Sequence, residues 1–155
     1  MRSRGITCAM RRIGERRLPG QLYRDRPGAY GILVGSDGML LLVDQEGELQ
    51  LPGGGIDPGE GAVQALHREV IEETGWRICD IRRLGAFQRY SYLPEYGFWA
   101  RKVQLIHTAR AVRRLGPPSE PGHQPLWMAP FDAASKLDVE GDRMMVRHAI
   151  ALGLI

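Results

Sequence analysis

Cysteine, lysine and long apolar runs are scarce in this chain of 155 residues. The two cysteines, Cys8 and Cys79, have no CxxC or other metal-ligand spacing, which argues against a zinc site and against a disulfide framework. Apolar runs such as residues 38–43 fall far short of the roughly 20 residues that span a bilayer. The basic N-terminal residues lack the apolar core of about 7 to 15 residues found in secretory signals. We therefore expect a soluble, cytoplasmic protein with no membrane partner.

Arginine supplies almost all of the positive charge, because Lys102 and Lys136 are the only lysines and the net charge is +3. Eight arginines lie before residue 27, so we predict a basic N-terminal arm over residues 1–26. Residues 6–10 are a candidate for a short strand within this arm. Such a charge block is usually solvated, although it can also contact phosphates or an acidic partner. The arm carries no recognised nucleic-acid motif and no run of interleaved aromatics, which argues against a nucleic-acid partner.

The remaining residues, 27–155, make up one domain of ordinary size. Apolar runs and alternation predict strands, and a 3.6-residue period predicts helices. Strands are expected at residues 29–34, 39–44, 48–52, 76–92, 98–112 and 126–130, and helices at residues 61–74, 130–137 and 140–153. Residues 116–125 are expected to form a loop because they are rich in proline and glycine. Strands on both sides of one central helix predict an α+β domain with a mixed sheet, rather than a doubly wound α/β sheet.

The helix predicted at residues 61–74 carries an acidic face. Glu69, Glu72 and Glu73 are spaced i, i+3 and i+4, so they lie on one side of the helix. Three carboxylates this close repel one another, and a divalent cation relieves that repulsion. Hard oxygen ligands suit Mg²⁺ or Mn²⁺. A solvated acidic face is the simpler alternative.

Three consecutive glycines, Gly53, Gly54 and Gly55, precede this helix. Glycine allows positive φ and close approach of a ligand to the backbone, so we predict a loop whose amides bind phosphate oxygens. A glycine triplet alone is weak evidence, because turns use glycine everywhere. Its position directly before an acidic helix gives it weight.

The combined pattern resembles the Nudix box, G-x5-E-x7-R-E-U-x-E-E-x-G-U, in which U is aliphatic. The matching residues are Gly54, Glu60, Arg68, Glu69, Val70, Glu72, Glu73 and Gly75. Trp76 departs from the pattern at the last aliphatic position. The resemblance implies a MutT-like Nudix hydrolase over residues 27–155, with a mixed sheet sandwiched between helices in an α/β/α fold. Such an enzyme is a pyrophosphatase for nucleoside diphosphate derivatives. The sequence does not decide between a monomer and a homodimer.

The resemblance also implies roles for individual residues. Glu69, Glu72 and Glu73 would be metal ligands, while Arg68 would pair with Glu60 and brace the glycine loop. For the general base, Glu69 and Glu73 are candidates within the box. Glu120 resembles an acid that some relatives contribute from this loop, and Glu95 is a second option outside the box. Both loop acids have the simpler interpretation of solvated surface glutamates.

The substrate is less well defined by the sequence. Tyr92 resembles a tyrosine of diadenosine polyphosphate hydrolases, Pro94 is near a proline of ADP-sugar hydrolases, and the stretch from Leu51 to Glu60 resembles MutT-type triphosphate pyrophosphatases. The strands at residues 29–34 and 39–44 are expected to pair as one hairpin, and those at residues 76–92 and 98–112 as a second, larger one. Aromatics of the second hairpin, namely Phe87, Tyr90, Tyr92, Tyr96, Phe98 and Trp99, are candidates to stack on a base. Among the histidines, only His123 is expected near the substrate. The alternatives to an enzyme are a non-catalytic nucleotide sensor or interaction domain of the same fold, and a basic-arm nucleic-acid binder.

Overall fold

The computed structural model describes residues 10–155, so all but the last residue of the strand expected at residues 6–10 lies outside them. The strands are β1 (Arg24–Val34), β2 (Leu40–Gln45), β3 (Glu48–Gln50), β4 (Gly53–Gly55), β5 (Trp76–Leu93), β6 (Phe98–Arg114) and β7 (His123–Met128). The helices are α1 (Ala62–Thr74), α2 (Pro130–Lys136) and α3 (Glu140–Ala151). No helix within residues 10–155 combines the length and the apolar character that crossing a membrane demands.

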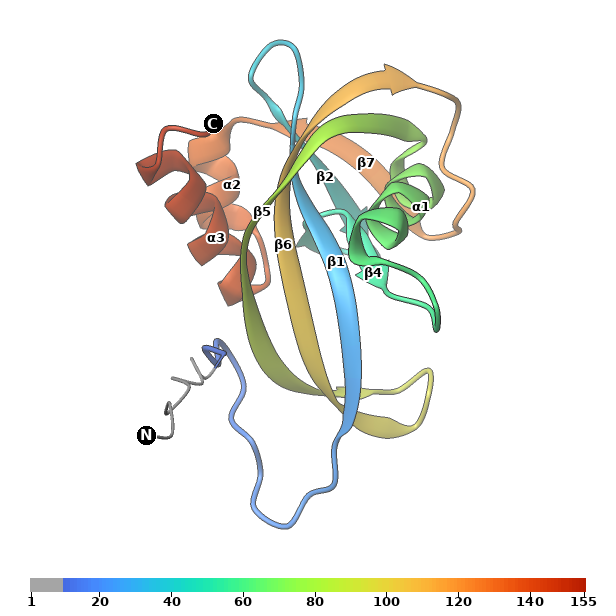
Figure 1. The fold of residues 1–155 in the computed structure, drawn as a ribbon, viewed down its shortest axis with the longest axis vertical. Helices are drawn as coiled ribbons and strands as arrows, with labels where there is room; N and C mark the ends of the chain where they lie inside the picture. Colours follow the sequence, from blue (N-terminus) through green and yellow to red (C-terminus); the bar gives the residue numbers. More distant parts are fainter. Residues whose placement is uncertain (1–9) are drawn as a thin grey trace, which may run out of the picture.

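One mixed sheet forms the centre of the molecule (Figure 1). Its main path runs β3-β2-β1-β6-β5, with β4 paired to β1 and β7 paired to β2. β1 and β6 run parallel along the whole of β1, from Arg24 opposite Ala100 to Val34 opposite Arg110. The other neighbouring strands are antiparallel, including the two hairpins expected from the sequence. A mixed sheet of this kind is therefore confirmed.

Helices cover both faces of the sheet, with α1 on one side and α2 and α3 on the other (Figure 1). Successive residues of a strand point to opposite faces, so neighbours such as Ile32 and Leu33 enter different cores. Ile32 packs in a cluster that includes Val146 of α3, whereas Leu33 packs in a cluster that includes Leu66 of α1. All four side chains are fully buried, which confirms the expected α/β/α arrangement.

The glycine triplet is not the loop that the sequence predicted. It forms β4, in which Gly53 and Gly54 lie opposite Tyr30 and Ala29 of β1. A Cβ atom at Gly53 would lie 2.2 Å from the carbonyl oxygen of Ala29, and its φ is 144°, so only glycine fits so close to β1. Sequence propensity missed the strand because glycine is normally depleted in strands.

The predicted loop over residues 116–125 is also too long at its C-terminal end. β7 begins at His123, and Pro125 lies within it, opposite Val43 of β2. β7 is an edge strand, where the missing N–H of a proline leaves no partner unsatisfied.

Part of the basic N-terminal segment packs on the sheet, while its arginines Arg11, Arg12, Arg16 and Arg17 stay exposed. The backbone of Gln88 in β5 donates to Arg11 and accepts from Ile13, and Ile13 is only 7% exposed. The sheet itself begins at Arg24, three residues before the boundary expected at residue 27. A single buried isoleucine among arginines gives no periodic signal, so the sequence did not reveal this contact.

Candidate active site

Helix α1 presents the acidic residues and ends at Gly75, the glycine that directly follows the helix predicted at residues 61–74. Leu66 and Val70 are fully buried against the sheet, which turns the acidic face away from this core, toward β4 and the loop before β7. The helix closes at Gly75, whose φ is 73° and whose N–H donates to the carbonyl of Ile71. A Cβ at Gly75 would lie 1.9 Å from the carbonyl oxygen of Gly116. Glycine therefore both ends the helix and lets the loop after β6 pass close to it.

That loop brings Glu120 to the acidic face. The backbone N–H groups of Ser119 and Glu120 both donate to the carbonyl of Glu72, at 2.9 and 3.0 Å. As a result, one carboxylate oxygen from each of Glu69, Glu72 and Glu120 lies within 4.8 Å of the others. A second group within the same distance joins Glu73, Glu120 and His123. Acids predicted from two different parts of the chain, the helix and the loop before β7, thus lie close together.

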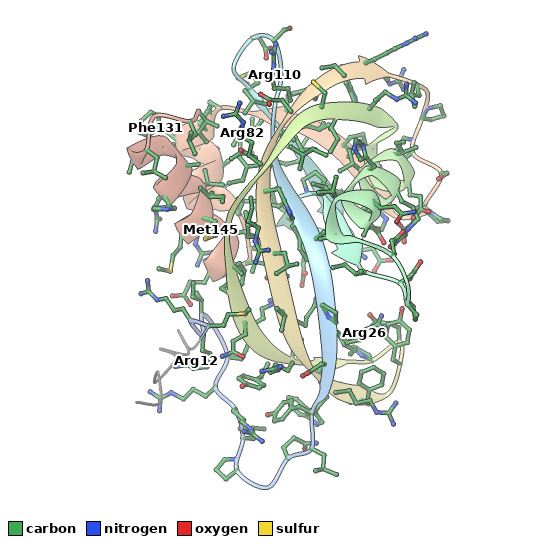
Figure 2. The ribbon with its side chains drawn as sticks, in the orientation of Figure 1. Arg12, Arg26, Arg82, Arg110, Phe131 and Met145 are labelled. Atoms are coloured by element: carbon green, nitrogen blue, oxygen red, sulfur yellow. The ribbon has the colours of Figure 1, made fainter. Side chains whose placement is uncertain are left out.

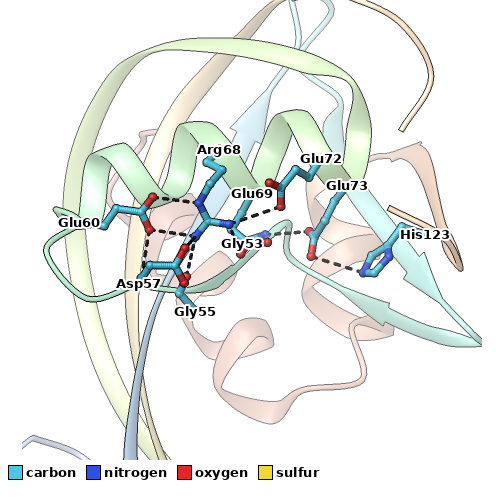
Figure 3. A network of polar contacts seen from close by, with 9 residues as sticks. All are labelled: Gly53, Gly55, Asp57, Glu60, Arg68, Glu69, Glu72, Glu73 and His123. Atoms are coloured by element: carbon cyan, nitrogen blue, oxygen red, sulfur yellow. Dashed lines mark hydrogen bonds and ion pairs between the residues drawn. The ribbon is translucent and has the colours of Figure 1, made fainter. Parts of the chain in front are cut away.

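Arg68 lies at the centre of a polar network (Figure 3). Its Nε and Nη2 each lie 2.9 Å from a carboxylate oxygen of Glu60, and Nη2 also donates to the carbonyl of Gly55. This guanidinium, together with the N–H of Asp57, holds the pKa of Glu60 down at about 2. Arg68 thereby ties the start of α1 to β4. Sequence analysis overlooked Asp57, whose carboxylate lies 3.5 Å from Arg68.

Arg68 also reaches the acidic face, in addition to the pairing with Glu60 that the family resemblance implied. Its Nη1 donates to Glu69 at 2.9 Å and to Glu72 at 3.4 Å. Arginine is long enough to reach neighbours on the next turn of its own helix. The repulsion between the glutamates is thus partly relieved by Arg68, and a cation is not their only source of positive charge.

Glu73 is the most enclosed of the helix acids. Its side chain is 10% exposed, accepts the N–H of Gly53 at 3.0 Å, and lies 3.4 Å from Nε2 of His123 (Figure 3). Burial raises the pKa of Glu73, the carboxylates of Glu69, Glu120 and Glu72 add to this effect and the Gly53 amide opposes it, and together they bring the pKa to about 9. Burial likewise raises the pKa of Glu69. These carboxylates lie where more positive charge would stabilise their ionised form.

The glycines of β4 position the acidic side chains and Arg68, and they do not form the phosphate-binding loop that the sequence predicted. The Gly53 N–H is taken up by Glu73, so it is not available to a phosphate in the way that the sequence predicted. A Cβ at Gly54 would lie 2.5 Å from Cδ of Glu69, so only glycine at this position leaves room for the carboxylate of Glu69. Gly55 contributes its carbonyl to Arg68.

The chemistry of this donor set fits a hard divalent cation. The ligand atoms are carboxylate oxygens, with one imidazole at the side, and they gather closely enough to share an ion. Thiolates, which would select softer metals, are absent from the groups found in residues 10–155. Magnesium or manganese therefore suits the cluster.

The other expected acid, Glu95, lies elsewhere. It sits in the turn between β5 and β6 and lines a cleft of about 160 Å³ that also includes Gly55, Arg26 and Tyr96. The groups of close ligand atoms within residues 10–155 do not include it. Of the two loop acids proposed from the sequence, only Glu120 joins the helix carboxylates.

Comparison with known proteins agrees with this geometry. The family model described as NUDIX domain matches residues 24–149. A protein of Bacillus subtilis (strain 168), to which 8-oxo-dGTP diphosphatase activity is attributed, is 32% identical over 108 residues, which cover 66% of this chain and 72% of that protein. An RNA pyrophosphohydrolase of Pectobacterium carotovorum subsp. carotovorum (strain PC1) is 36% identical over 67 residues, 42% of this chain and 38% of that protein.

The fold agrees as well. The crystal structure of a MutT NUDIX hydrolase from Burkholderia pseudomallei superposes with a TM-score of 0.64 at 24% identity, over 80% of this chain and 97% of that one. The family match spans nearly the whole sheet, all of α1 and the cluster of acids around it. This chain therefore belongs to the Nudix family and is a MutT-like Nudix hydrolase.

Proposed function

We propose that the protein hydrolyses a diphosphate linkage in a nucleotide derivative and depends on Mg²⁺ or Mn²⁺ to do so. The observation that carries the proposal is the meeting of Glu69, Glu72 and Glu120, with oxygens within 4.8 Å of one another, beside the buried Glu73. Arg68 offsets only part of the repulsion among these carboxylates, so a cation would stabilise them further, and it would also neutralise the anionic oxygens of a phosphate substrate. The named activities of the relatives, on 8-oxo-dGTP and on RNA, support a nucleotide substrate.

In this proposal Glu69, Glu72 and Glu73 would hold the cation, and Glu120 lies close enough to assist. When bound, the cation neutralises phosphate oxygens and lowers the pKa of a nearby water. Arg68 and the Gly53 amide orient Glu69 and Glu73, as their hydrogen bonds indicate. Glu60 acts at one remove, because it orients Arg68.

Glu120 is the proposed general base. It approaches the cluster from a loop, whereas Glu69 is already engaged by Arg68 and Glu73 by Gly53. In the reaction, the oxygen of water forms a bond to one phosphorus while the bond from that phosphorus to the bridging oxygen breaks. The bridging oxygen leaves with the other phosphate group, and one proton of the water passes to Glu120. We place this activity in the cytoplasm, because the cysteines show neither disulfide nor metal spacing.

The proposal is tested with nucleoside triphosphates, including 8-oxo-dGTP, a dinucleoside polyphosphate and ADP-ribose, each with Mg²⁺ or with EDTA. The products are separated by chromatography: pyrophosphate or phosphate with a nucleotide from a triphosphate, two nucleotides from a dinucleoside polyphosphate, and AMP with ribose 5-phosphate from ADP-ribose. We expect product formation that requires Mg²⁺ and falls at least 100-fold in Glu72→Gln. Glu140→Gln, which changes an exposed acid at the start of α3, serves as the matched control and should stay within twofold of wild type. Absence of turnover on every compound would instead favour a nucleotide sensor.

A further inference from the structure

A cleft of about 790 Å³ lies beside the first two turns of α1. Its walls are residues 61–64 and His67 on the helix side, and Ile81, Arg83 and His107 on the side of β5 and β6. The groups of close acids found in residues 10–155 share none of these residues. Clefts of this size commonly hold small molecules. The cleft is therefore a candidate ligand site outside the acidic cluster.

The cleft and the acidic cluster lie on opposite sides of α1. Val63 and Glu72 are nine residues apart, so at about 100° per residue they point in opposite directions from the helix axis. His67 and Glu69 differ by about 200° on the same reckoning. A ligand in the cleft would thus contact the side of α1 that does not carry the proposed metal ligands.

The start of α1 offers unpaired hydrogen-bond donors beside this cleft. The first backbone hydrogen bond of the helix runs from the N–H of Ala65 to the carbonyl of Gly61, at 2.9 Å. The N–H groups of Ala62, Val63 and Gln64 precede it and have no partner within the helix. Among the described residues no side chain caps them, and the first turn contains no acid. These N–H groups and the helix dipole favour an anion.

His107 gives a second, independent indication of a ligand. It lines the cleft and is only 3% exposed. The backbone of Tyr30 and Leu105 lies near the ring, yet Nδ1 has no hydrogen-bond partner within residues 10–155. Burial lowers the pKa of His107, so the ring is neutral at pH 7.5 and carries one N–H donor and one acceptor nitrogen. Buried polar atoms are nearly always paired, so this unpaired ring points to a partner that a ligand supplies.

Arg83 supplies positive charge on the strand side. It lies directly opposite His107 in the pairing of β5 with β6. Its side chain is exposed and, in the part of the chain that the structure describes, it forms no ion pair. Its Nε lies 3.4 Å from the carbonyl of Gly85, which leaves both terminal nitrogens of the guanidinium for a ligand. The walls of the cleft contain no acid that would oppose an anion.

The cleft also has an apolar side and is much larger than a single anion. Val63 is 48% exposed, and Ile81 is partly exposed on the facing strand. An inorganic ion would leave both side chains in contact with water, whereas an apolar ring or chain would cover them. The ligand that fits this cleft therefore combines an anionic group with an apolar body.

We propose that the cleft beside the start of α1 is a second ligand site, which binds the phosphate group of a phosphate monoester whose body is apolar. The phosphate oxygens would accept hydrogen bonds from the first-turn N–H groups and from Arg83, and the ring of His107 would gain a polar partner. Val63 and Ile81 would pack on the apolar body. This site goes beyond the proposed function and does not depend on it.

The test is a titration followed by amide proton–nitrogen correlation spectra of the full chain in EDTA, where no metal can draw phosphate to the acids. The probes are phenyl phosphate, inorganic phosphate, benzoate and phenol at constant ionic strength. We expect phenyl phosphate to shift the amide signals of residues 61–64 and of Arg83 in a saturable way. Inorganic phosphate should shift the same signals more weakly, and benzoate and phenol should bind at least about fivefold more weakly than phenyl phosphate.

Three variants test the separate parts of the site. Arg83→Gln should weaken phenyl phosphate binding at least about fivefold. Val63→Ser should weaken it about threefold and leave inorganic phosphate within about twofold of wild type. Arg82→Gln is the matched control, because Arg82 is the preceding residue of β5, is also exposed, and lines a different cleft with Leu154 beyond α3 (Figure 2). It should change the Kd less than twofold, and circular dichroism melting checks that all three variants fold.

The outcomes either support the second site or overturn it. Signals that shift around β4 and the acids of α1 instead, or a Kd that is unchanged in Arg83→Gln, would overturn it. Phenol that binds as tightly as phenyl phosphate would show an apolar cleft without anion recognition, and benzoate that binds more tightly would reassign the anion to a carboxylate. Because the titration involves neither metal nor turnover, its failure would leave the proposed hydrolysis at the acidic cluster standing.

Discussion

Replacing Glu73 by glutamine should stabilise the metal-free protein at neutral pH. Burial raises the pKa of Glu73 from 4.5 to about 9, so the folded chain holds a proton there that the unfolded chain releases above its lower pKa. The sign follows directly: the stability due to this group is fully present below about pH 4.5 and is lost as pH rises toward 9. Glutamine resembles the protonated acid and carries no such pH dependence.

The size of the effect follows from the same pKa. A pH of 7.5 is three units above the unfolded pKa of 4.5, and each unit corresponds to about 1.36 kcal/mol. Glu73 should therefore lower the free energy of unfolding at pH 7.5 by about 4 kcal/mol relative to low pH. Glu73→Gln should therefore match wild type near pH 5 and exceed it by up to about 4 kcal/mol near pH 7.5. Mg²⁺ at about 100 times its Kd should raise the free energy of unfolding of wild type by about 2.7 kcal/mol, and that of the variant by much less.

Urea unfolding in EDTA at the two pH values, then with Mg²⁺, measures these differences. Glu46→Gln removes an exposed acid and should change the free energy of unfolding by less than about 0.5 kcal/mol at either pH. A Glu73→Gln variant that is equal to or less stable than wild type at pH 7.5 would refute the electrostatic account of the buried acid.

Three other substitutions test the supports of the site. Gly54→Ala should displace Glu69, because the new Cβ would lie 2.5 Å from Cδ of Glu69. Calorimetry should then show Mg²⁺ binding weakened at least tenfold. Gly55→Ala is the matched control, because the nearest contact of its new Cβ is 3.8 Å away. Arg68→Gln should lower the free energy of unfolding by about 2 kcal/mol through lost charged hydrogen bonds. It should also reduce the pH dependence that the depressed pKa of Glu60 confers, because only the Asp57 N–H would still lower that pKa. This stability is present above about pH 4.5 and is lost as pH falls toward 2, and acid unfolding curves that match wild type would contradict the prediction. Glu120→Gln should lower kcat by about 100- to 10,000-fold while Mn²⁺ affinity changes far less, whereas Glu95→Gln should keep wild-type kcat; the reverse result would reassign the base.

Local sequence patterns predicted the elements that depend on local physics. The period of apolar residues around Leu66 and Val70, followed by Gly75, was sufficient to locate α1 and its acidic face. The two hairpins followed from apolar runs separated by glycine-containing turns. The α/β/α arrangement followed from the order of these elements and from the family resemblance.

Features that depend on contacts between distant segments were not predictable in the same way. β4 forms because Gly53 can lie against Ala29, a contact that strand propensity does not encode. The position of Glu120 depends on two backbone hydrogen bonds to the carbonyl of Glu72, so its distance from the helix could not be read from spacing. The parallel pairing of β1 with β6 joins partners that are more than 70 residues apart in the chain, so it also could not be derived from local patterns.

The central claim is that the glutamates of α1 bind a divalent cation that hydrolysis requires. The most direct test is a Mn²⁺ titration followed by electron paramagnetic resonance, in which the signal of free Mn²⁺ disappears as the ion binds protein. We predict that wild type removes the signal and that Glu72→Gln and Glu73→Gln each weaken binding at least tenfold. The titration is repeated with an ATP analogue, and the Mn²⁺ that the analogue binds by itself is subtracted. A free Mn²⁺ signal that wild type does not diminish, either with or without the analogue, would contradict the claim.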